Sequence, residues 1–243
     1  MLEPWANSVE KFSKGKVKIN IAPGMSLGGK PSDLVKQARE GKFVDLIWTI
    51  NGYSGKEFLR YVHQGQAIQS KGYAVHKPAG LLGKKARVPS RTGAWVLEEL
   101  GAKTISVPVT RIPQSMQRNI VTTALIPFNV QPILGLERHV TYFTEGYDQV
   151  RFGSVIFQVS INASKWESLP AEIKDAFRKA SDEQFLKEIG QMWKDDEQRG
   201  IEVMQKFGKE HIVLTQAETD EFRSKLEPVV ERWISDVSKS GVD

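Results

Sequence analysis

The spacing of hydrophobic and polar residues changes several times within the first fifty positions. Residues 2–12 repeat apolar side chains at helical intervals and predict an amphipathic helix that ends near Gly15. Residues 16–22, KVKINIA, alternate charged and apolar residues, as a half-buried strand does. A helix over about 31–41 precedes an almost continuously apolar run at 43–50, which is typical of a buried parallel strand. Helices and strands therefore alternate, as in an α/β protein.

The middle of the chain continues this alternation with shorter elements. Residues 67–76 predict a pair of strands or an extended segment. The further expected strands are 84–90, 103–109, 122–128 and 153–162, and the expected helices are 91–100 and 114–120.

The pattern changes from about residue 169 onwards to long helices. One apolar stripe predicts a single helix that begins after Ser168 as N-cap and continues to about Phe207. Such a length suggests a helix that crosses from one lobe to another, with a kink near Gly190 or Gly200. A strand at 211–214 and a helix at 217–238 follow.

Composition narrows the classes of function. The 243 residues suffice for one large domain or for two lobes of about 100 residues each. The absence of cysteine excludes disulfides, thiol catalysis and iron–sulfur clusters. The net charge of +5 is compatible with anion binding and also with simple solubility. No apolar run approaches the roughly 20 residues that span a bilayer, and any export signal is expected upstream of Met1.

The stretch GMSLG at 24–28 matches the G-x-S-x-G pattern of a nucleophile elbow and makes Ser26 a candidate nucleophile. An elbow launches its helix directly from the serine, whereas here two glycines, Lys30 and Pro31 intervene. The alternative is a glycine-rich loop that turns the chain or offers backbone N–H groups to an anion. A serine hydrolase is therefore the second functional hypothesis.

Other candidate chemistry is sparse. The four histidines lack metal-binding spacing, so no metal site is expected; His63 ends a strand and is the one of interest, while His76, His139 and His211 are expected at the surface. The acidic run at 194–200 is interpreted as the solvated face of the long helix. No nucleic-acid-binding motif is present, and no cofactor is expected.

The run KKARVPSR at 84–91 is divided by strand alternation. Lys85 and Arg87 point to one face of a strand and Ala86 to the other, so the basic residues do not form one continuous patch. Arg87 lies near the carboxyl end of its strand, where open α/β sheets bind ligands. It is either a carboxylate-binding arginine or a surface arginine in an ion pair.

Four segments together resemble the periplasmic solute receptors of tripartite ATP-independent periplasmic (TRAP) transporters, the DctP-like family. They occur in the family's order and cover most of the chain. These segments are FSKGKVKINIAPGMSLGGKPSDLVKQAREGKFVDLIWT (12–49), GKKARVPSRTGAWVLEELGA (83–102), SVPVTRIPQSMQRN (106–119) and INASKWESLPAEIKDAF (161–177).

The resemblance implies a two-lobed α/β fold of the periplasmic-binding-protein type, with a long helix spanning both lobes. It implies a non-enzymatic, monomeric receptor in the periplasm that binds a small carboxylate and passes it to membrane permease subunits. The expected division is 1–62 for the first part of lobe I, 63–153 for lobe II, 154–200 for the return to lobe I with the spanning helix, and 201–243 for a strand and helix that pack across the lobes.

The resemblance also assigns site residues. The arginine of the family's K-x-R-x-P stretch, which binds the carboxylate, falls on Arg87. The other ligand-binding positions that it implies are Trp48, Tyr53, Gln66, the segment 126–129 with Phe128 and Asn129, and Phe157.

The chain departs from the family pattern in several places. The family usually carries a long additional segment between the positions of Phe58 and Tyr61, so a shortened first lobe is expected. The common V-D-G is here Val121-Thr122-Thr123, and Arg111 replaces a usual acid.

Overall fold

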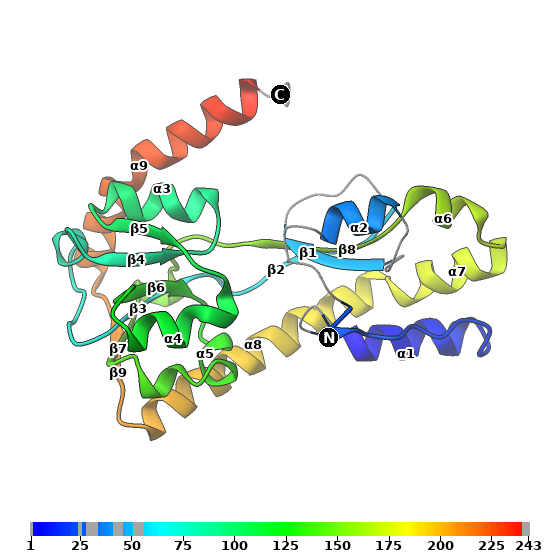
Figure 1. Ribbon diagram of the computed structural model, residues 1–243, viewed down its shortest axis with the longest axis horizontal. Helices are drawn as coiled ribbons and strands as arrows, with labels where there is room; N and C mark the ends of the chain where they lie inside the picture. Colours follow the sequence, from blue (N-terminus) through cyan, green and yellow to red (C-terminus); the bar gives the residue numbers. More distant parts are fainter. Residues whose placement is uncertain (1, 24–25, 28–33, 41–45, 51–55, 240–243) are drawn as a thin grey trace. The chain divides into compact units, whose positions relative to one another are not determined.

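The computed structural model describes residues 2–23, 26–27, 34–40, 46–50 and 56–239, with backbone alone at 46–50. The chain divides into two compact units (Figure 1). Unit 1 contains residues 1–63 and 155–193, and unit 2 contains residues 64–154 and 194–243. Within the described residues, no helix is both long and apolar enough to span a membrane.

Unit 1 is built on a three-stranded antiparallel sheet of order β1-β8-β2. Its core is rich in aromatic rings; Phe58 stacks on Phe177 at a centroid distance of 4.9 Å, and Trp5 and Trp166 pack around them. The strands are β1 (Leu46–Ile50), β2 (Lys56–Val62) and β8 (Ile156–Ile161), and the helices are α1 (Leu2–Phe12), α2 (Leu34–Glu40), α6 (Ala163–Ser168), α7 (Ala171–Ala180) and the first part of α8 (Glu183–Lys206).

Two strand predictions in unit 1 are wrong. Residues 16–22 form no strand; Val17 and Ile19 instead pack as partly buried side chains against the aromatic core, which satisfies the same alternating pattern without strand pairing. The apolar run at 46–50 is a strand, but it pairs with β8 in the antiparallel sense rather than the parallel one. The first three residues of the predicted 43–50 strand, 43–45, lie outside the described residues. The hydrophobic pattern of the sequence did not predict β2.

The expected single helix from 169 to 207 is two helices. It breaks between α7 and α8 rather than at Gly190 or Gly200, because the side chain of Asp182 accepts a hydrogen bond from the Phe185 amide at 2.8 Å and begins a new helix. Ser181 in the break accepts a hydrogen bond from the indole of Trp5 at 2.9 Å. Ser168 does not cap the long helix; it ends α6.

Unit 2 is built on a six-stranded mixed sheet of order β5-β4-β6-β3-β7-β9. Helices α3 and α9 cover one face, and α4, α5 and the second part of α8 cover the other (Figure 1). The strands are β3 (Ala67–Ser70), β4 (Lys85–Val88), β5 (Lys103–Ser106), β6 (Thr123–Ile126), β7 (Tyr142–Glu145) and β9 (Glu210–Val213), and the helices are α3 (Arg91–Glu99), α4 (Ile112–Gln117), α5 (Val130–Ile133) and α9 (Gln216–Lys239).

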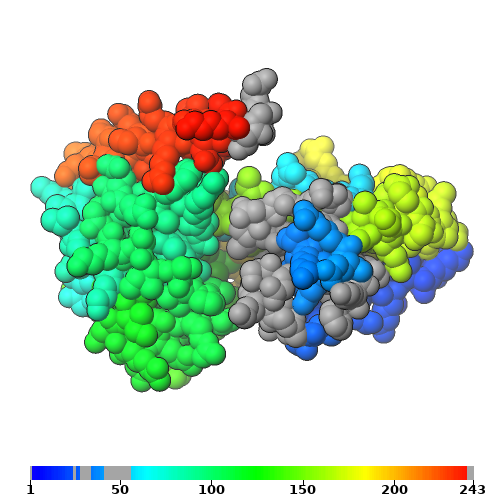
Figure 2. Space-filling view, turned by 45° about the horizontal axis from the view of Figure 1, so that its top comes forward, coloured from blue at the N-terminus to red at the C-terminus, as the bar shows by residue number. Residues whose placement is uncertain are grey.

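Helix α9 lies along the surface of unit 2, where Figure 2 shows it in orange to red. Its charged side chains pair with α3: Lys225 with Glu99 at 2.9 Å and Arg232 with Glu98 at 3.7 Å. These exposed pairs contribute little stability, so the buried Phe222 in the core cluster supplies the main attachment.

One row of residues in register runs across five strands of this sheet. Arg87 of β4 lies opposite Ala124 of β6, which lies opposite Gln69 of β3; Gln69 lies opposite Phe143 of β7, and Phe143 opposite His211 of β9. Paired residues in adjacent strands share a face of the sheet. The row therefore places Arg87 and His211 on the face that α4, α5 and α8 cover.

The division of α8 differs from the expected lobe boundary at 200. The helix changes unit after Trp193, because Glu197 is already held by unit 2: one carboxylate oxygen accepts a hydrogen bond from the amide of Asn129 at 3.1 Å, and the other pairs with Arg151 at 3.4 Å.

Candidate functional site

Arg87 occupies the third position of β4, between the parallel strands β5 and β6. Its side chain contacts the backbone on either side, at the residue after the end of β5 and at the third residue of β6. Nε donates to the carbonyl oxygen of Val107 at 3.1 Å, and Nη1 donates to that of Leu125 at 3.2 Å. These two bonds fix the plane of the guanidinium, and Arg87 as a residue is only 8% exposed.

The charge of this arginine is not balanced within the described part of the chain. No carboxylate of a described residue forms an ion pair with Arg87, and Nη2 donates no hydrogen bond to one. Desolvation lowers the pKa of Arg87 to about 10, so the group stays protonated at neutral pH. A buried, oriented cation with unused donors is costly on its own and matches the two oxygens of a carboxylate.

The neighbouring basic residues have other surroundings. Lys85 is exposed and donates to the carbonyl of Asn119 at 3.3 Å, and Lys84 lies over the ring of Tyr73. Arg91 follows the N-cap Ser90 of α3 and pairs with Asp236 at 2.7 Å on the surface. The basic run is therefore not one patch.

The other predicted ligand-binding residues are divided between the units. In unit 2, Gln66 is buried just before β3, Asn129 is buried before α5, and Phe128 is fully buried in the core cluster of the α8 face. In unit 1, the ring of Phe157 stacks on Tyr61 at 5.6 Å. The structure describes only the backbone of Trp48, which lies in β1 and pairs with Val159 of β8. Tyr53 lies outside the described residues.

Ser26 lacks the surroundings of a nucleophile. It lies in an exposed turn, and its own amide donates to the carbonyl of Pro23 at 3.0 Å. No strand occurs in the described stretch before it, residues 2–23. Among the described residues, its hydroxyl contacts no histidine that could act as a base. The remaining glycines of the loop, 24 and 28–29, lie outside the described residues.

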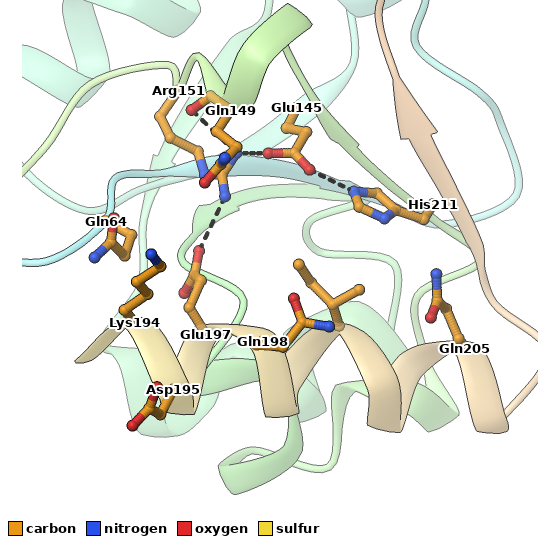
Figure 3. Close-up of a pocket in the computed structure, with 11 residues that line it drawn as sticks. Gln64, Glu145, Gln149, Arg151, Lys194, Asp195, Glu197, Gln198, Gln205 and His211 are labelled. Atoms are coloured by element: carbon orange, nitrogen blue, oxygen red, sulfur yellow. Dashed lines mark hydrogen bonds and ion pairs between the residues drawn. The ribbon is translucent and has the colours of Figure 1, made fainter. Parts of the chain in front are cut away.

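A buried charged cluster in unit 2, made of Glu145, Arg151, Glu197 and His211, was missed by the sequence analysis (Figure 3). Arg151 pairs with Glu145 and, at 3.4 Å, with Glu197, while Nε2 of His211 lies 2.7 Å from Oε1 of Glu145. The four line a cavity of about 570 Å³. The expectation of a surface His211 is wrong, since its side chain is only 14% exposed. The expectation of a fully solvated 194–200 run is wrong as well, since Glu197 is only 5% exposed.

Burial shifts the pKa values in this cluster. Desolvation lowers the pKa of His211 to about 4, with a further decrease from the charge of Arg151. Desolvation also raises the pKa of Glu197 and lowers that of Arg151. At neutral pH a neutral His211 therefore donates one N–H to Glu145.

Metal binding finds no support in the described residues, because they contain no group of three or more His, Asp or Glu side chains arranged around a common point. Arg87 itself offers ion pairing and hydrogen bonding.

Residues 51–236 match the family model of DctP, the bacterial extracellular solute-binding proteins of family 7. The chain belongs to this family. The match confirms the resemblance found in the sequence, and it includes Arg87 and the whole of unit 2 except its last residues. Members of this family are transport proteins rather than enzymes. A comparison with curated proteins finds no match.

Solved structures of similar proteins confirm the two-lobed α/β fold. A TRAP solute-binding protein from an unidentified marine microbe, in complex with metahydroxyphenylacetate, is 24% identical with a TM-score of 0.93, and the match covers 100% of this chain and 88% of that one. One from Rhodoferax ferrireducens with copurified benzoate is 22% identical, with the same TM-score and coverage. One from Bordetella bronchiseptica with bound mandelate is 16% identical, with a TM-score of 0.89 and coverage of 100% and 89%.

Proposed function

We propose that this DctP-family protein is the periplasmic receptor of a TRAP transporter and that it binds a small organic acid through Arg87. The observation that carries the proposal is the buried guanidinium, which is oriented by two carbonyl oxygens and has no carboxylate partner among the described residues. A ligand carboxylate would supply the missing anion.

The geometry of Arg87 favours a carboxylate over other anions. Nε and one Nη1 proton are engaged by the carbonyls, which leaves Nη2 and the second Nη1 proton for the ligand. These N–H groups form a fork that donates two parallel hydrogen bonds to the two oxygens of a carboxylate. A lysine at this position would offer a single point charge and could not also hold both carbonyls.

The ligand class to be tested first is the aromatic monocarboxylic acids. Two of the similar structures contain benzoate or metahydroxyphenylacetate, each with one carboxylate on or near a ring. A single arginine without a second cation among its described neighbours matches one carboxylate rather than two. Trp48, Tyr53, Gln66, Asn129 and Phe157 remain proposed contacts to the rest of the ligand, and Phe128 would act by packing because its side chain is fully buried.

Binding is non-covalent in this proposal. The acid would be released unchanged to the membrane permease subunits of the transporter, in keeping with the solute-binding family to which the chain belongs. The hydrolase hypothesis for Ser26 gains no support from the structure.

Two measurements on the purified protein test the proposal. Mass spectrometry of small molecules released by denaturation is expected to identify a carboxylic acid that co-purifies. Isothermal titration calorimetry with benzoate, 3-hydroxybenzoate, mandelate and glucuronate is expected to show saturable binding of at least one acid. If none of the four binds and no acid co-purifies, the receptor proposal fails.

A further inference from the structure

The charged cluster lies where the chain enters and leaves unit 2. The chain passes between the units three times, after His63, after Ser154 and after Trp193. The unit 2 side of each of these points contributes to the cavity: Gln64 after the first, Arg151 just before the second, and Lys194 with Glu197 after the third (Figure 3). We call the unit 2 residues next to these three points the connections: 64–66 is the first, 151–154 the second and 194–197 the third.

Arg151 is at the centre of the contacts that hold the connections to unit 2. Its guanidinium joins Glu145 at the end of β7 to Glu197 of α8, and it lies 4.7 Å above the ring of Phe128. Its side chain is 8% exposed. The first connection packs on its stem, because a Cβ atom at Gly65 would come within 2.5 Å of the Cβ of Arg151.

The first and second connections are also joined directly through their backbones. The amide of Gln66 donates to the carbonyl of Gly153 at 2.7 Å, and the amide of Phe152 donates to the carbonyl of Gln66 at 2.9 Å. Arg151 thus lies beside a short paired stretch of the two connections, and its two carboxylate partners extend that stretch to the sheet and to α8.

A five-residue segment, 125–129, links this cluster to Arg87. At its beginning the carbonyl of Leu125 accepts a hydrogen bond from Arg87, and at its end the amide of Asn129 donates to Glu197. Between them, α8 approaches so closely that a Cβ at Gly200 would lie 2.2 Å from the carbonyl oxygen of Phe128. Movement of α8 or of Glu197 must therefore displace the segment that orients Arg87.

The buried polar side chains beneath the segment strengthen this link. Nε2 of Gln69 donates to the carbonyl of Ile126 at 3.3 Å, and Nε2 of the Gln131 side chain donates to Oε1 of Gln69. Gln69 belongs to the row that connects Arg87 to His211 across the sheet. The segment is thus held from both sides by directional contacts rather than by apolar packing alone.

We propose that Arg151 is a positioning residue for acid binding: with Glu145 and Glu197 it fixes the three connections to unit 2 and keeps the segment 125–129 where Arg87 needs it. Arg151 sets the affinity for the acid without touching it. This role rests on the proposed function. Buried charge networks contribute little net stability compared with apolar residues of the same shape, but they specify one arrangement of the groups that they join.

The test compares Glu197→Gln with the matched control Asp196→Asn. The glutamine still has an oxygen that accepts the hydrogen bond from Asn129, but it loses the ion pair with Arg151. The control, on the same helix, removes only an exposed ion pair with Arg199. Benzoate and 3-hydroxybenzoate are the probes; calorimetry gives the Kd, and stopped-flow tryptophan fluorescence gives the association and dissociation rates.

The expected result is a Kd at least about fivefold weaker in Glu197→Gln, chiefly from faster dissociation, with Asp196→Asn unchanged. Arg151→Lys, which keeps the charge, is the second variant and is expected to bind more weakly than wild type and more tightly than Arg151→Met. A purely structural role would lower the melting temperature and leave the Kd and rates of the folded protein unchanged, and that result would overturn the proposal.

The two proposals fail in different ways. If the wild-type chain binds the acids and both Glu197→Gln and Arg151→Lys bind them with wild-type Kd and rates, the positioning role is wrong and the receptor function stands. If the wild-type chain binds no acid, the receptor function fails, and the positioning role fails with it.

Discussion

Replacement of Arg87 by methionine is expected to weaken acid binding by about tenfold to about 150-fold. Methionine has a similar length and no charge, so it removes both donors that face the ligand. A charge-assisted hydrogen bond contributes about 1.5–3 kcal/mol, and each 1.4 kcal/mol is a factor of about ten in Kd. The expected loss of affinity includes only one such contribution, because the two hydrogen bonds of a bidentate pair are not additive.

Stability is a poor readout of this substitution. Methionine removes a buried charge, which favours folding, but it leaves the carbonyls of Val107 and Leu125 without their donors, at a cost of about 1–3 kcal/mol for each buried acceptor. These effects oppose each other, so the melting temperature does not report the ligand contact. Binding must be measured directly in the folded protein.

The assay is isothermal titration calorimetry with the acid that binds the wild-type chain most tightly. Arg87→Lys is expected to recover only part of the affinity, because its single ammonium cannot hold both carbonyls and the carboxylate. Lys85→Met is the matched control: it lies in the same strand and the same basic run but is exposed, so its Kd is expected to stay within about twofold of wild type. Equal affinity in wild type, Arg87→Met and Arg87→Lys would refute the assignment.

Three further outcomes are expected. Between pH 6.5 and about 4 the unfolded chain protonates His211 while the folded protein does not, so the free energy of unfolding falls as the pH falls through this window. The expected decrease is about 1–2 kcal/mol after allowance for the partial exposure of the side chain. Urea titrations of wild type at several pH values check this, and in His211→Phe that part of the pH dependence should vanish. Gly65→Ala is expected to lose more than about 2 kcal/mol, because φ is +114° and the added Cβ meets Arg151; wild-type stability in urea would contradict the packing. Ser26→Ala is expected to bind the acid as wild type does, with no ester turnover by either protein, and turnover that disappears in the variant would restore the hydrolase hypothesis.

The environment of His211 explains the direction of its pH effect. The charged groups beside the imidazole are Glu145 from β7 and Arg151 from the second connection, and Glu197 and Lys194 of α8 line the same cavity. A second positive charge there would face Arg151 with little water to screen it. The neutral form is therefore the one that the folded protein retains.

The sequence predicted those features that depend on local patterns. Alternation in KKARVPSR separated Arg87 from Ala86, and the structure has both buried, on opposite faces of β4. Ser90 caps α3 through its side chain, which accepts from the amide of Gly93 at 3.1 Å, and this local signal agrees with the predicted start of that helix at 91. Local rules sufficed because each feature is decided by a few adjacent residues.

The charged cluster could not be found in this way. Its members come from β7, the second connection, α8 and β9, and on α8 Glu197 stands among exposed charges that look alike in sequence. Only the tertiary contact with Asn129 and Arg151 distinguishes Glu197 from its neighbours. The strand expected at 16–22 failed for a related reason, since an alternating pattern also suits an extended segment that packs on a core without strand pairing.

A crystal structure of the protein with its bound acid is the most direct test of whether Arg87 binds the carboxylate. The ligand carboxylate is expected to lie within hydrogen-bonding distance, about 3 Å, of Nη2 of Arg87, while Nε still donates to Val107 and Nη1 to Leu125. An acid bound with its carboxylate away from Arg87, or an Arg87 paired with a carboxylate of the protein itself, would contradict it.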